Sequence, residues 1–179
     1  MNIKSVCVFC GSSPGNKTTF EFSARELGLN IGLHKINLVY GGGQNGLMGA
    51  VADGALKNGG KVIGVIPRHL VEREKGHKGL TDLIVVENMY ERKRKMIDLA
   101  DAFVVLPGGV GTLDETFEIL TYKQLGIHNK PIILLDVENY WKDFNDILNT
   151  TIHFGFTSPT IKNLYQIVFS PHEVFSTLD

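Results

Sequence analysis

The segment Pro107–Glu115 (PGGVGTLDE) has the composition of an anion-binding loop. Its glycines leave the backbone free to fold closely around a phosphate; they are Gly108, Gly109 and Gly111. Thr112 can cap a helix that begins here, or donate its hydroxyl to the same ligand. Such a helix would also offer free N–H groups and the positive end of its dipole, so the segment is predicted to bind an anion.

Two carboxylates, Asp114 and Glu115, follow the glycines. In the first turn of a helix, acidic side chains ordinarily complement the helix dipole, which contributes only ~0.3–1 kcal/mol. A carboxylate beside an anion-binding loop also repels the ligand that the loop attracts. The arrangement becomes useful if a carboxylate acts on a part of the ligand away from the phosphate, so one of the two is a candidate catalytic group.

The basic run Glu91–Lys95 (ERKRK) is typical of a solvated helix face, but a helical wheel indicates more. One apolar arc of that wheel is formed by Met89, Met96, Ile97, Leu99 and Ala100. Arg92 and Lys93 project inside this arc, and the other charges of the run lie opposite. Because burying an unpaired cation costs several kcal/mol, both are predicted to meet an anion. Snorkelling from the edge of the arc stays open as an alternative, chiefly for Lys93.

Apolar runs rich in Val and Ile alternate with segments of helical period. Strands are predicted over residues 5–10, 36–40, 61–66, 83–86, 102–106, 131–135 and 165–169. Helices are predicted over residues 18–34, 47–58, 90–100, 113–125 and 140–154, and from Pro171 onward. A polar stretch over 68–82 is predicted to form a loop or flap. Because continuous apolar strands are buried on both faces, we expect one α/β domain over residues 1–179. We expect this domain to contain a doubly wound Rossmann-like parallel sheet of six to seven strands with helices on both faces.

In such a sheet, ligands bind outside the carboxyl ends of the strands. Three predicted strand-to-helix turns are rich in small residues: Gly11–Ser13, Gly41–Gly46 and Pro107–Thr112. A tight turn alone would explain any one of them. All three lie at the same edge, however, and together they favour an anionic ligand such as a phosphate. Gly42 and Gly43 are therefore predicted to contact the substrate.

The segment Gly41–Gly46 (GGGQNG) also matches the G-x-G-x-x-G pattern of dinucleotide-binding proteins. The usual partner of this pattern is an acidic residue at the end of the next strand, which binds the ribose hydroxyls. Here that strand ends in Ile66, Pro67 and Arg68. An arginine could suit a 2′-phosphate, but the adjoining proline makes the site a poor copy. A nicotinamide dinucleotide is disfavoured, and no cofactor is predicted.

The composition excludes several classes of protein. The 179 residues carry 18 Lys and Arg against 19 Asp and Glu, a net charge of −1, which argues against a dedicated nucleic-acid-binding protein. No apolar run reaches the roughly 18 residues of a membrane span, and the N-terminal segment has no secretory signal pattern. The protein is therefore expected in the cytoplasm, without nucleic-acid or membrane partners.

Cysteine and histidine spacing gives no metal or redox signature. Cys7 and Cys10 are too few for a disulfide framework or a four-ligand zinc site. Along a strand their spacing puts the two thiols on opposite faces, so we expect core cysteines rather than a redox pair. The six histidines lack paired-ligand spacing, and no metal is predicted.

The pairing of Met89–Lys93 (MYERK) with Pro107–Glu115 resembles the signature of the Lonely Guy proteins, which are cytokinin riboside 5′-monophosphate phosphoribohydrolases. Further segments similar to that family are 6–13 (VCVFCGSS), 40–43 (YGGG), 46–49 (GLMG), 124–128 (QLGIH) and 155–156 (GF). Some relatives have been labelled lysine decarboxylases. These motifs would bind a phosphate, however, and no pyridoxal-lysine context is visible.

The resemblance implies hydrolysis of the N-glycosidic bond of a purine nucleoside 5′-monophosphate, which releases the base and ribose 5-phosphate. Arg92 and Glu115 would be the catalytic pair. Residues that would hold the phosphate and ribose are Gly108, Gly109, Gly111 and Thr112. Residues that would line the same site are Lys93, Asp114 and Thr121, with Glu74 of the polar flap as a further substrate contact.

Two positions depart from the family pattern. Asp114 stands where a glutamate is common, which preserves the carboxylate, and Val110 replaces a frequent tyrosine. The relatives are dimers with sites near the subunit interface, so the resemblance also implies a homodimer.

The sequence leaves the substrate open between an N6-prenylated adenine nucleotide and AMP. Met89, Met96 and Leu125 are candidate apolar lining for a prenyl group, although each also suits a core. A non-catalytic nucleotide-binding or carrier protein on the same fold is the alternative function, because a fold does not fix a function. A simple phosphate-binding protein has little use for an acid at position 115, which favours the hydrolase.

Overall fold

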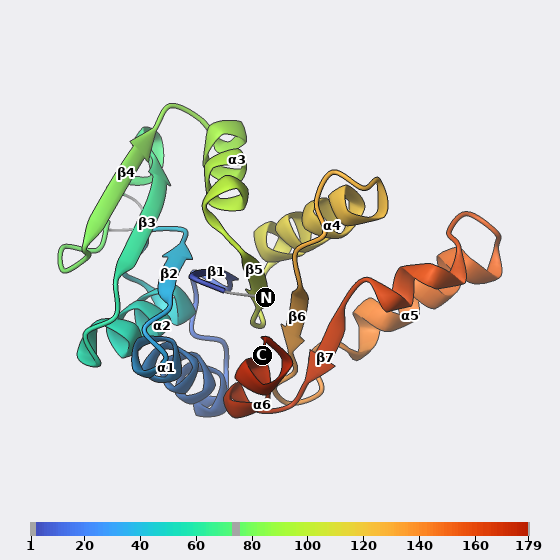
Figure 1. Ribbon diagram of the computed structural model, residues 1–179, viewed down its shortest axis with the longest axis horizontal. Helices are drawn as coiled ribbons and strands as arrows, with labels where there is room; N and C mark the ends of the chain where they lie inside the picture. The colour runs from blue at the N-terminus through green and yellow to red at the C-terminus, as the bar shows by residue number, and fades with distance from the viewer. Residues whose placement is uncertain (1–2, 73–75, 179) are drawn as a thin grey trace.

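The computed structural model describes residues 3–72 and 76–178, and its strands form one parallel sheet in the order β4-β3-β2-β1-β5-β6-β7 (Figure 1). The strands are β1 (Ser5–Phe9), β2 (Asn37–Tyr40), β3 (Val62–Pro67), β4 (Asp82–Val86), β5 (Ala102–Val105), β6 (Ile132–Leu135) and β7 (Gln166–Val168). All neighbouring pairs are parallel, as the continuous apolar runs predicted.

Helices cover both faces of the sheet (Figure 1). One face is covered by α1 (Thr18–Leu33), α2 (Gly46–Lys57) and α6 (Pro171–Leu178). The other face is covered by α3 (Met89–Leu99), α4 (Val110–Gln124) and α5 (Lys142–His153). Two short 3-10 helices span Arg68–Leu70 and Pro159–Asn163. The doubly wound α/β fold expected from the sequence is confirmed, and the polar stretch after β3 contains the first of these short helices.

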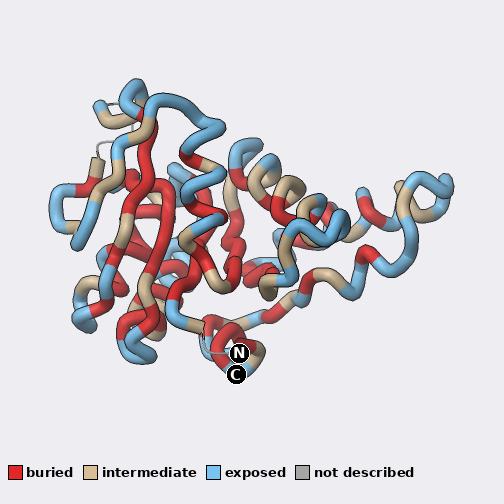
Figure 2. Tube along the Cα trace, turned by 45° about the horizontal axis from the view of Figure 1, so that its top comes forward, coloured by how far each residue is buried: buried red, intermediate tan, exposed pale blue. Residues whose placement is uncertain are grey.

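The central strands are buried along their whole length, which Figure 2 shows as continuous red tube through the middle of the molecule. Successive side chains alternate between two apolar layers, one on each face of the sheet. Cys7 packs in the layer under α3, α4 and α5, and Cys10 in the layer under α1 and α2. The prediction of core cysteines on opposite faces of the sheet is confirmed, since both thiols are buried and lie in different apolar layers.

The sheet has its topological switch point between β1 and β5, because the chain runs outward from β1 through β2 and later returns to its other side. Loops that follow these two strands diverge to opposite faces, which opens a crevice at their carboxyl ends. The amide of Gly11 donates to the carbonyl of Pro107 at 3.0 Å, and the amide of Leu47 donates to the carbonyl of Gly11 at 3.1 Å. The three small-residue turns therefore meet at one edge, as predicted.

Asp101, which directly precedes β5, connects that strand to the amino-terminal end of β1 through hydrogen bonds. Its carboxylate accepts hydrogen bonds from the amides of Lys4 and Ser5, both at 2.9 Å, and from the Ser5 hydroxyl at 3.1 Å. Partial burial acts to raise the pKa of Asp101, but these hydrogen bonds outweigh it and hold the pKa below its ordinary value of 3.8. The stabilisation is therefore present above the ordinary pKa and is lost as the pH falls through the lower folded-state value.

We predict that Asp101→Asn lowers the free energy of unfolding at pH 7 by about 1 kcal/mol, a value reduced by the partial exposure of the carboxylate. The variant should also lose less stability than the wild type when the pH is lowered from 5 to below 3. Urea denaturation at the two pH values measures both effects. Asp98→Asn, which removes an exposed i,i+4 pair with Arg94, is the control. Equal denaturation midpoints for wild type and Asp101→Asn at pH 7 would contradict the prediction.

Candidate active site

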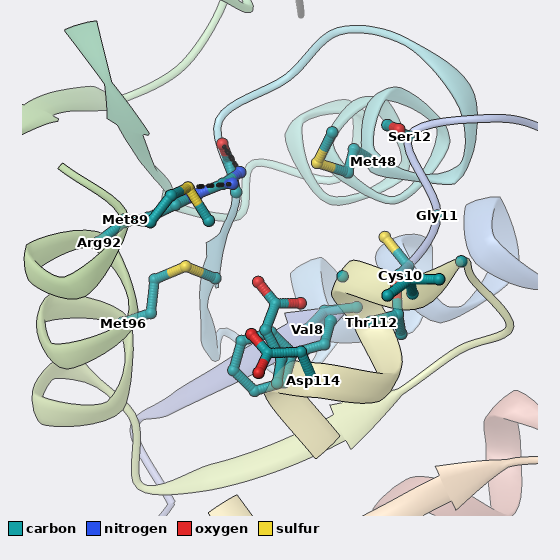
Figure 3. Close-up of a pocket in the computed structure, with 16 residues that line it drawn as sticks. Val8, Cys10, Gly11, Ser12, Met48, Met89, Arg92, Met96, Thr112 and Asp114 are labelled. Carbon is teal, nitrogen blue, oxygen red and sulfur yellow. Dashed lines mark hydrogen bonds between the residues drawn. The ribbon is translucent and has the colours of Figure 1, made fainter. Parts of the chain in front are cut away.

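A cavity of about 270 Å³ opens at the switch point, between the carboxyl ends of β1 and β2 and the helices α3 and α4 (Figure 3). Sequence-predicted residues that line it are Arg92, Gly109, Gly111, Thr112, Asp114 and Glu115. A neighbouring cavity of about 410 Å³ shares Gly11, Ser12 and Gly109 with it. Gly108 lines this second cavity. The phosphate-binding loop predicted from the sequence therefore lies between the two cavities.

Several other predicted contacts lie away from the cavity. Gly42 and Gly43 belong to the loop after β2, but Gly41 is the residue of that loop that lines it. Thr121 is exposed and lies in α4 about two turns beyond the residues of that helix that line the cavity. Leu125, a candidate for a prenyl pocket, is exposed at the end of the same helix. Glu74 lies outside the described residues.

Arg92 enters the cavity from α3, and its side chain is buried, as the helical wheel predicted; the residue is 6% exposed. Its Nη2 donates to the carbonyl of Gly41 at 2.7 Å, and its Nε donates to the carbonyl of Val65 at 3.0 Å. Nη1 lies 3.8 Å from the sulfur of Met89, and Figure 3 shows the guanidinium between that sulfur and the β2 loop. Two main-chain carbonyls thus fix the plane of the guanidinium.

Gly41 makes this approach feasible, because a Cβ at that position would overlap Nη2 of Arg92. The absence of a side chain therefore serves the arginine as well as the turn.

Lys93, the other cation predicted to point inward, turns toward α4 instead of the cavity. Its Nζ lies 3.1 Å from Asp114 and 3.3 Å from Glu118. Burial acts to lower the pKa of Lys93, but the hydrogen bond and charge of Asp114 and the charge of Glu118 raise it. The anions that Lys93 meets are therefore carboxylates of the protein, and this contact joins α3 to α4.

Glu115 lines the cavity from the first turns of α4 and is partly buried. Its charge reaches Cys10, which lines the same cavity. Burial is the main cause that raises the pKa of the Cys10 thiol; the negative charge of Glu115 adds to it, and the positive charge of Arg92 opposes it. The two charges thus act on one thiol from within one small volume. A thiol with a raised pKa is a poor nucleophile.

Thr112 is buried in the first turn of α4, and its carbonyl accepts a hydrogen bond from the Thr116 hydroxyl at 2.6 Å. The N-cap of α4 is Gly109, which has no side chain to cap the helix. The alternative in which Thr112 is the cap is therefore wrong, since Thr112 lies inside the helix. The leading amides of α4 point out of the helix at the cavity, as anion-binding helix termini do.

Sequence reasoning missed Met48 as a lining residue, whereas Ser12 belongs to the Gly11–Ser13 turn that was predicted to face the ligand. Met48 lies in the first turn of α2 and is only 5% exposed, so its apolar side chain looked like part of the core. It lines the cavity together with Met89 and Met96, and Figure 3 shows it on α2, across the cavity from these two side chains of α3. Its position just after the glycine turn Gly41–Gly46, at the carboxyl edge of the sheet, was the signal that could have identified it.

No group of three or more His, Cys, Asp or Glu side chains in the described part of the chain could hold a metal ion. Among the same residues, no helix has both the length and the apolar character to cross a membrane.

Gly108 and Gly109 provide a matched test of the loop. A Cβ at Gly108 would overlap the Thr112 side chain and lie 2.8 Å from the Gly11 amide, whereas one at Gly109 would meet nothing within 4 Å. We predict that Gly108→Ala lowers the free energy of unfolding by about 1–3 kcal/mol, the usual cost of overpacking, and that Gly109→Ala changes it by less than about 0.5 kcal/mol. Thermal and urea unfolding measure both values. Equal stability of the two variants would mean that the loop tolerates a side chain at Gly108.

A family model described as "Possible lysine decarboxylase" matches residues 48–178. Among curated proteins, a cytokinin riboside 5′-monophosphate phosphoribohydrolase of Arabidopsis thaliana is 42% identical over 98% of this chain and 83% of its own length. A protein with the same activity in its name, from Rhodococcoides fascians, is 45% identical over 89% of this chain and 81% of its own length.

Among solved structures, a molybdenum cofactor binding protein from Rippkaea orientalis superposes with a TM-score of 0.72 at 22% identity. That match covers 99% of this chain and 96% of the other, and at this identity it establishes the fold alone. The identities of 42% and 45% to the curated relatives extend over 98% and 89% of this chain. The protein therefore belongs to the Lonely Guy family of cytokinin riboside 5′-monophosphate phosphoribohydrolases.

Proposed function

We propose that this protein hydrolyses the N-glycosidic bond of an adenine-type nucleoside 5′-monophosphate, a cytokinin riboside 5′-monophosphate or AMP, to the free base and ribose 5-phosphate. The observation that carries the proposal is the composition of one cavity. A buried arginine, Arg92, and a carboxylate, Glu115, line it together with the glycine loop at the start of α4. The activity named for the curated relatives gives independent support.

The proposed substrate orientation follows from the two ends of the cavity. The phosphate and ribose are held at the loop end, by the residues Gly108, Gly109, Gly111 and Thr112, where leading amides of α4 attract an anion. The base extends toward the methionines that line the cavity, Met48, Met89 and Met96. Methionine side chains are adaptable and make favourable contacts with aromatic rings, so they suit a purine. Asp114 also lines the cavity. Lys93, which is bonded to Asp114, keeps that carboxylate in place.

Cleavage of the glycosidic bond passes through an oxocarbenium-like state in which positive charge develops on the ribose. Glu115 stabilises that charge and orients or deprotonates the attacking water. The carbonyls of Gly41 and Val65 fix the guanidinium of Arg92. Its positive charge is therefore already in position for the substrate, and the side chain does not have to move during the reaction. Glu74 and Thr121 remain proposed substrate contacts on the strength of the family resemblance. Gly42 and Gly43 remain proposed contacts because the three small-residue turns meet at one edge.

The direct experiment is to incubate the purified protein with AMP and, separately, with isopentenyladenosine 5′-monophosphate, and to resolve the products by chromatography. We expect free base and ribose 5-phosphate in equal amounts. The ratio of the two values of kcat/KM then identifies the preferred substrate class. Intact nucleotide in both reactions, from a folded protein, would instead favour a nucleotide-binding or carrier protein.

We predict that Glu115→Gln lowers kcat by about 10²–10⁴-fold, the usual contribution of a positioned acid or base, and leaves nucleotide binding largely intact. The glutamine keeps the shape of the side chain and removes its charge. Single-turnover measurements of base release, together with calorimetric titration of AMP, separate chemistry from binding. Glu21→Gln, which removes an exposed ion pair with Arg25 on α1, is the matched control. Full turnover by Glu115→Gln would refute the assignment.

A lysine decarboxylase receives no support from the cavity. Pyridoxal-dependent decarboxylation needs a lysine that forms a Schiff base with the cofactor. The described residues that line the cavity include no lysine. Lys93, the neighbouring lysine on α3, is engaged by Asp114 and Glu118.

The protein is also proposed to act as a homodimer. Apolar side chains are exposed beside the cavity, at Met89, Tyr90 and Val110, and just beyond the C-terminal end of α4, at Leu125 and Ile127. Light scattering should therefore give the mass of two chains at micromolar concentration, and Ile127→Glu should shift it toward one. Phe169→Glu, which changes an apolar side chain equally exposed after β7, is the control. A wild-type protein with the mass of a single chain would contradict the proposal.

The proposed compartment is the cytoplasm. Its support is the pair of free, buried thiols Cys7 and Cys10, which suit a reducing environment. The near-neutral net charge of −1 supports a small-molecule substrate over a nucleic acid. The chain is proposed to work as a single nucleotide-binding hydrolase domain over residues 1–179.

A further inference from the structure

His77 makes three hydrogen bonds, although it belongs to no helix or strand and does not line the cavity. Its side chain is 8% exposed. The backbone N–H donates to the carbonyl of Gly42 at 3.0 Å. Ring Nε2 lies 3.0 Å from Oδ1 of Asp53 on α2. Ring Nδ1 accepts a hydrogen bond from the backbone N–H of Gly79 at 3.0 Å. One residue thus ties the segment Gly76–Leu80 to the loop after β2 and to α2.

The hydrogen bonds define the state of the imidazole. A backbone N–H can only donate, so Nδ1 must be the unprotonated nitrogen that accepts from Gly79. Nε2 then carries the hydrogen and donates to the carboxylate of Asp53. Both ring nitrogens are therefore used, and the ring has one orientation that satisfies them.

The loop that His77 contacts also holds the proposed catalytic arginine. The carbonyl of Gly41 accepts Nη2 of Arg92 at 2.7 Å, and the next carbonyl, that of Gly42, accepts the amide of His77 at 3.0 Å. Gly43 and Gly76 add an antiparallel bridge. The loop is thus bound on one side by Arg92 and on the other by the Gly76–Leu80 segment.

Asp53 completes the arrangement, because α2 begins directly after this loop. His77 connects the loop to the helix that follows it, through Gly42 at one end and Asp53 at the other. The backbone at Gly42 has φ of +78°, a conformation that glycine adopts freely and that needs external contacts to persist in one form.

We propose that His77 is a positioning residue for the reaction: through Asp53 and Gly42 it holds the Gly41–Gly43 loop, and thereby the guanidinium of Arg92, in the geometry that hydrolysis requires. The inference rests on the proposed function, in which Arg92 acts on the substrate. Displacing a catalytic group by about 1 Å can cost up to 10²-fold in rate. Binding of the phosphate depends on the loop at the start of α4, which His77 does not contact.

Two conservative variants test the two hydrogen bonds of the imidazole ring one at a time. In His77→Asn, the side-chain oxygen replaces Nδ1 as the acceptor for Gly79, but the side chain is too short to reach Asp53. In His77→Gln, the amide nitrogen replaces Nε2 as the donor to Asp53. We expect His77→Asn to lower kcat roughly ten- to a hundredfold with a change in KM of less than about threefold. His77→Gln should restore most of kcat.

Asp53→Ala tests the same contact from the other side. It should reproduce the kcat of His77→Asn, and the double variant should be no worse than either single variant, since both remove one interaction. His69→Asn, at an exposed histidine in the short helix after β3, is the control and should keep wild-type kinetics. Wild-type kcat in His77→Asn would overturn the proposal. So would a loss of thermal stability and activity that His77→Gln does not restore, because that pattern indicates a structural role only.

Amide hydrogen exchange keeps the test separate from the proposed function. The amide at position 77, which donates to Gly42, should exchange faster in His77→Asn than in wild type, whereas amides of the α4 loop should be unchanged. If the wild type releases no base from either nucleotide, the proposed function fails, and this exchange difference alone decides whether His77 holds the loop. Equal exchange in wild type and His77→Asn would overturn the positioning role.

Discussion

The buried guanidinium of Arg92 is costly to remove from water, and the surrounding structure supplies polar partners for it. Transfer of a cation from water into a protein interior costs several kcal/mol unless polar partners replace the water. For Arg92, two carbonyls supply part of that replacement: that of Gly41, just after β2, and that of Val65 in β3, beyond the last residue that pairs with β2. Strand ends offer carbonyls because the sheet no longer uses them there. The arginine therefore has to lie at the carboxyl edge of the sheet, which is where the crevice is.

This requirement also explains the neighbouring sequence. Residue 41 has no side chain, because a Cβ would occupy the place of the guanidinium. Helix α3 connects β4 to β5 (Figure 1). Its apolar arc turns Arg92 inward together with Met96, and both side chains are buried. The carboxylate of Glu115 arrives from the other side of the switch point on α4. Opposite charges from two helices thus meet in one small volume only when the sheet has its doubly wound order.

Sequence periodicity was sufficient for the fold because strands buried on both faces have an unambiguous apolar pattern. It was also sufficient for Arg92, since a cation inside an apolar arc has few alternatives to burial. The same wheel failed to separate Lys93 from Arg92, because its partners Asp114 and Glu118 belong to a different helix. Met48 and His77 were missed for a related reason. An apolar side chain and a loop histidine acquire their roles from tertiary neighbours that no local pattern encodes.

The backbone hydrogen bond between Gly11 and Pro107 joins two loops that are separated in sequence by more than half the length of the chain. The crevice therefore has no counterpart in any fragment that contains only β1 to β4, because its second wall is built from β5 and α4. Contacts of such long sequence separation form late in folding, after the loop-closure entropy of the intervening chain has been overcome. During refolding, helical structure will appear before the crevice does, and ligand binding will report the completion of the sheet rather than its beginning.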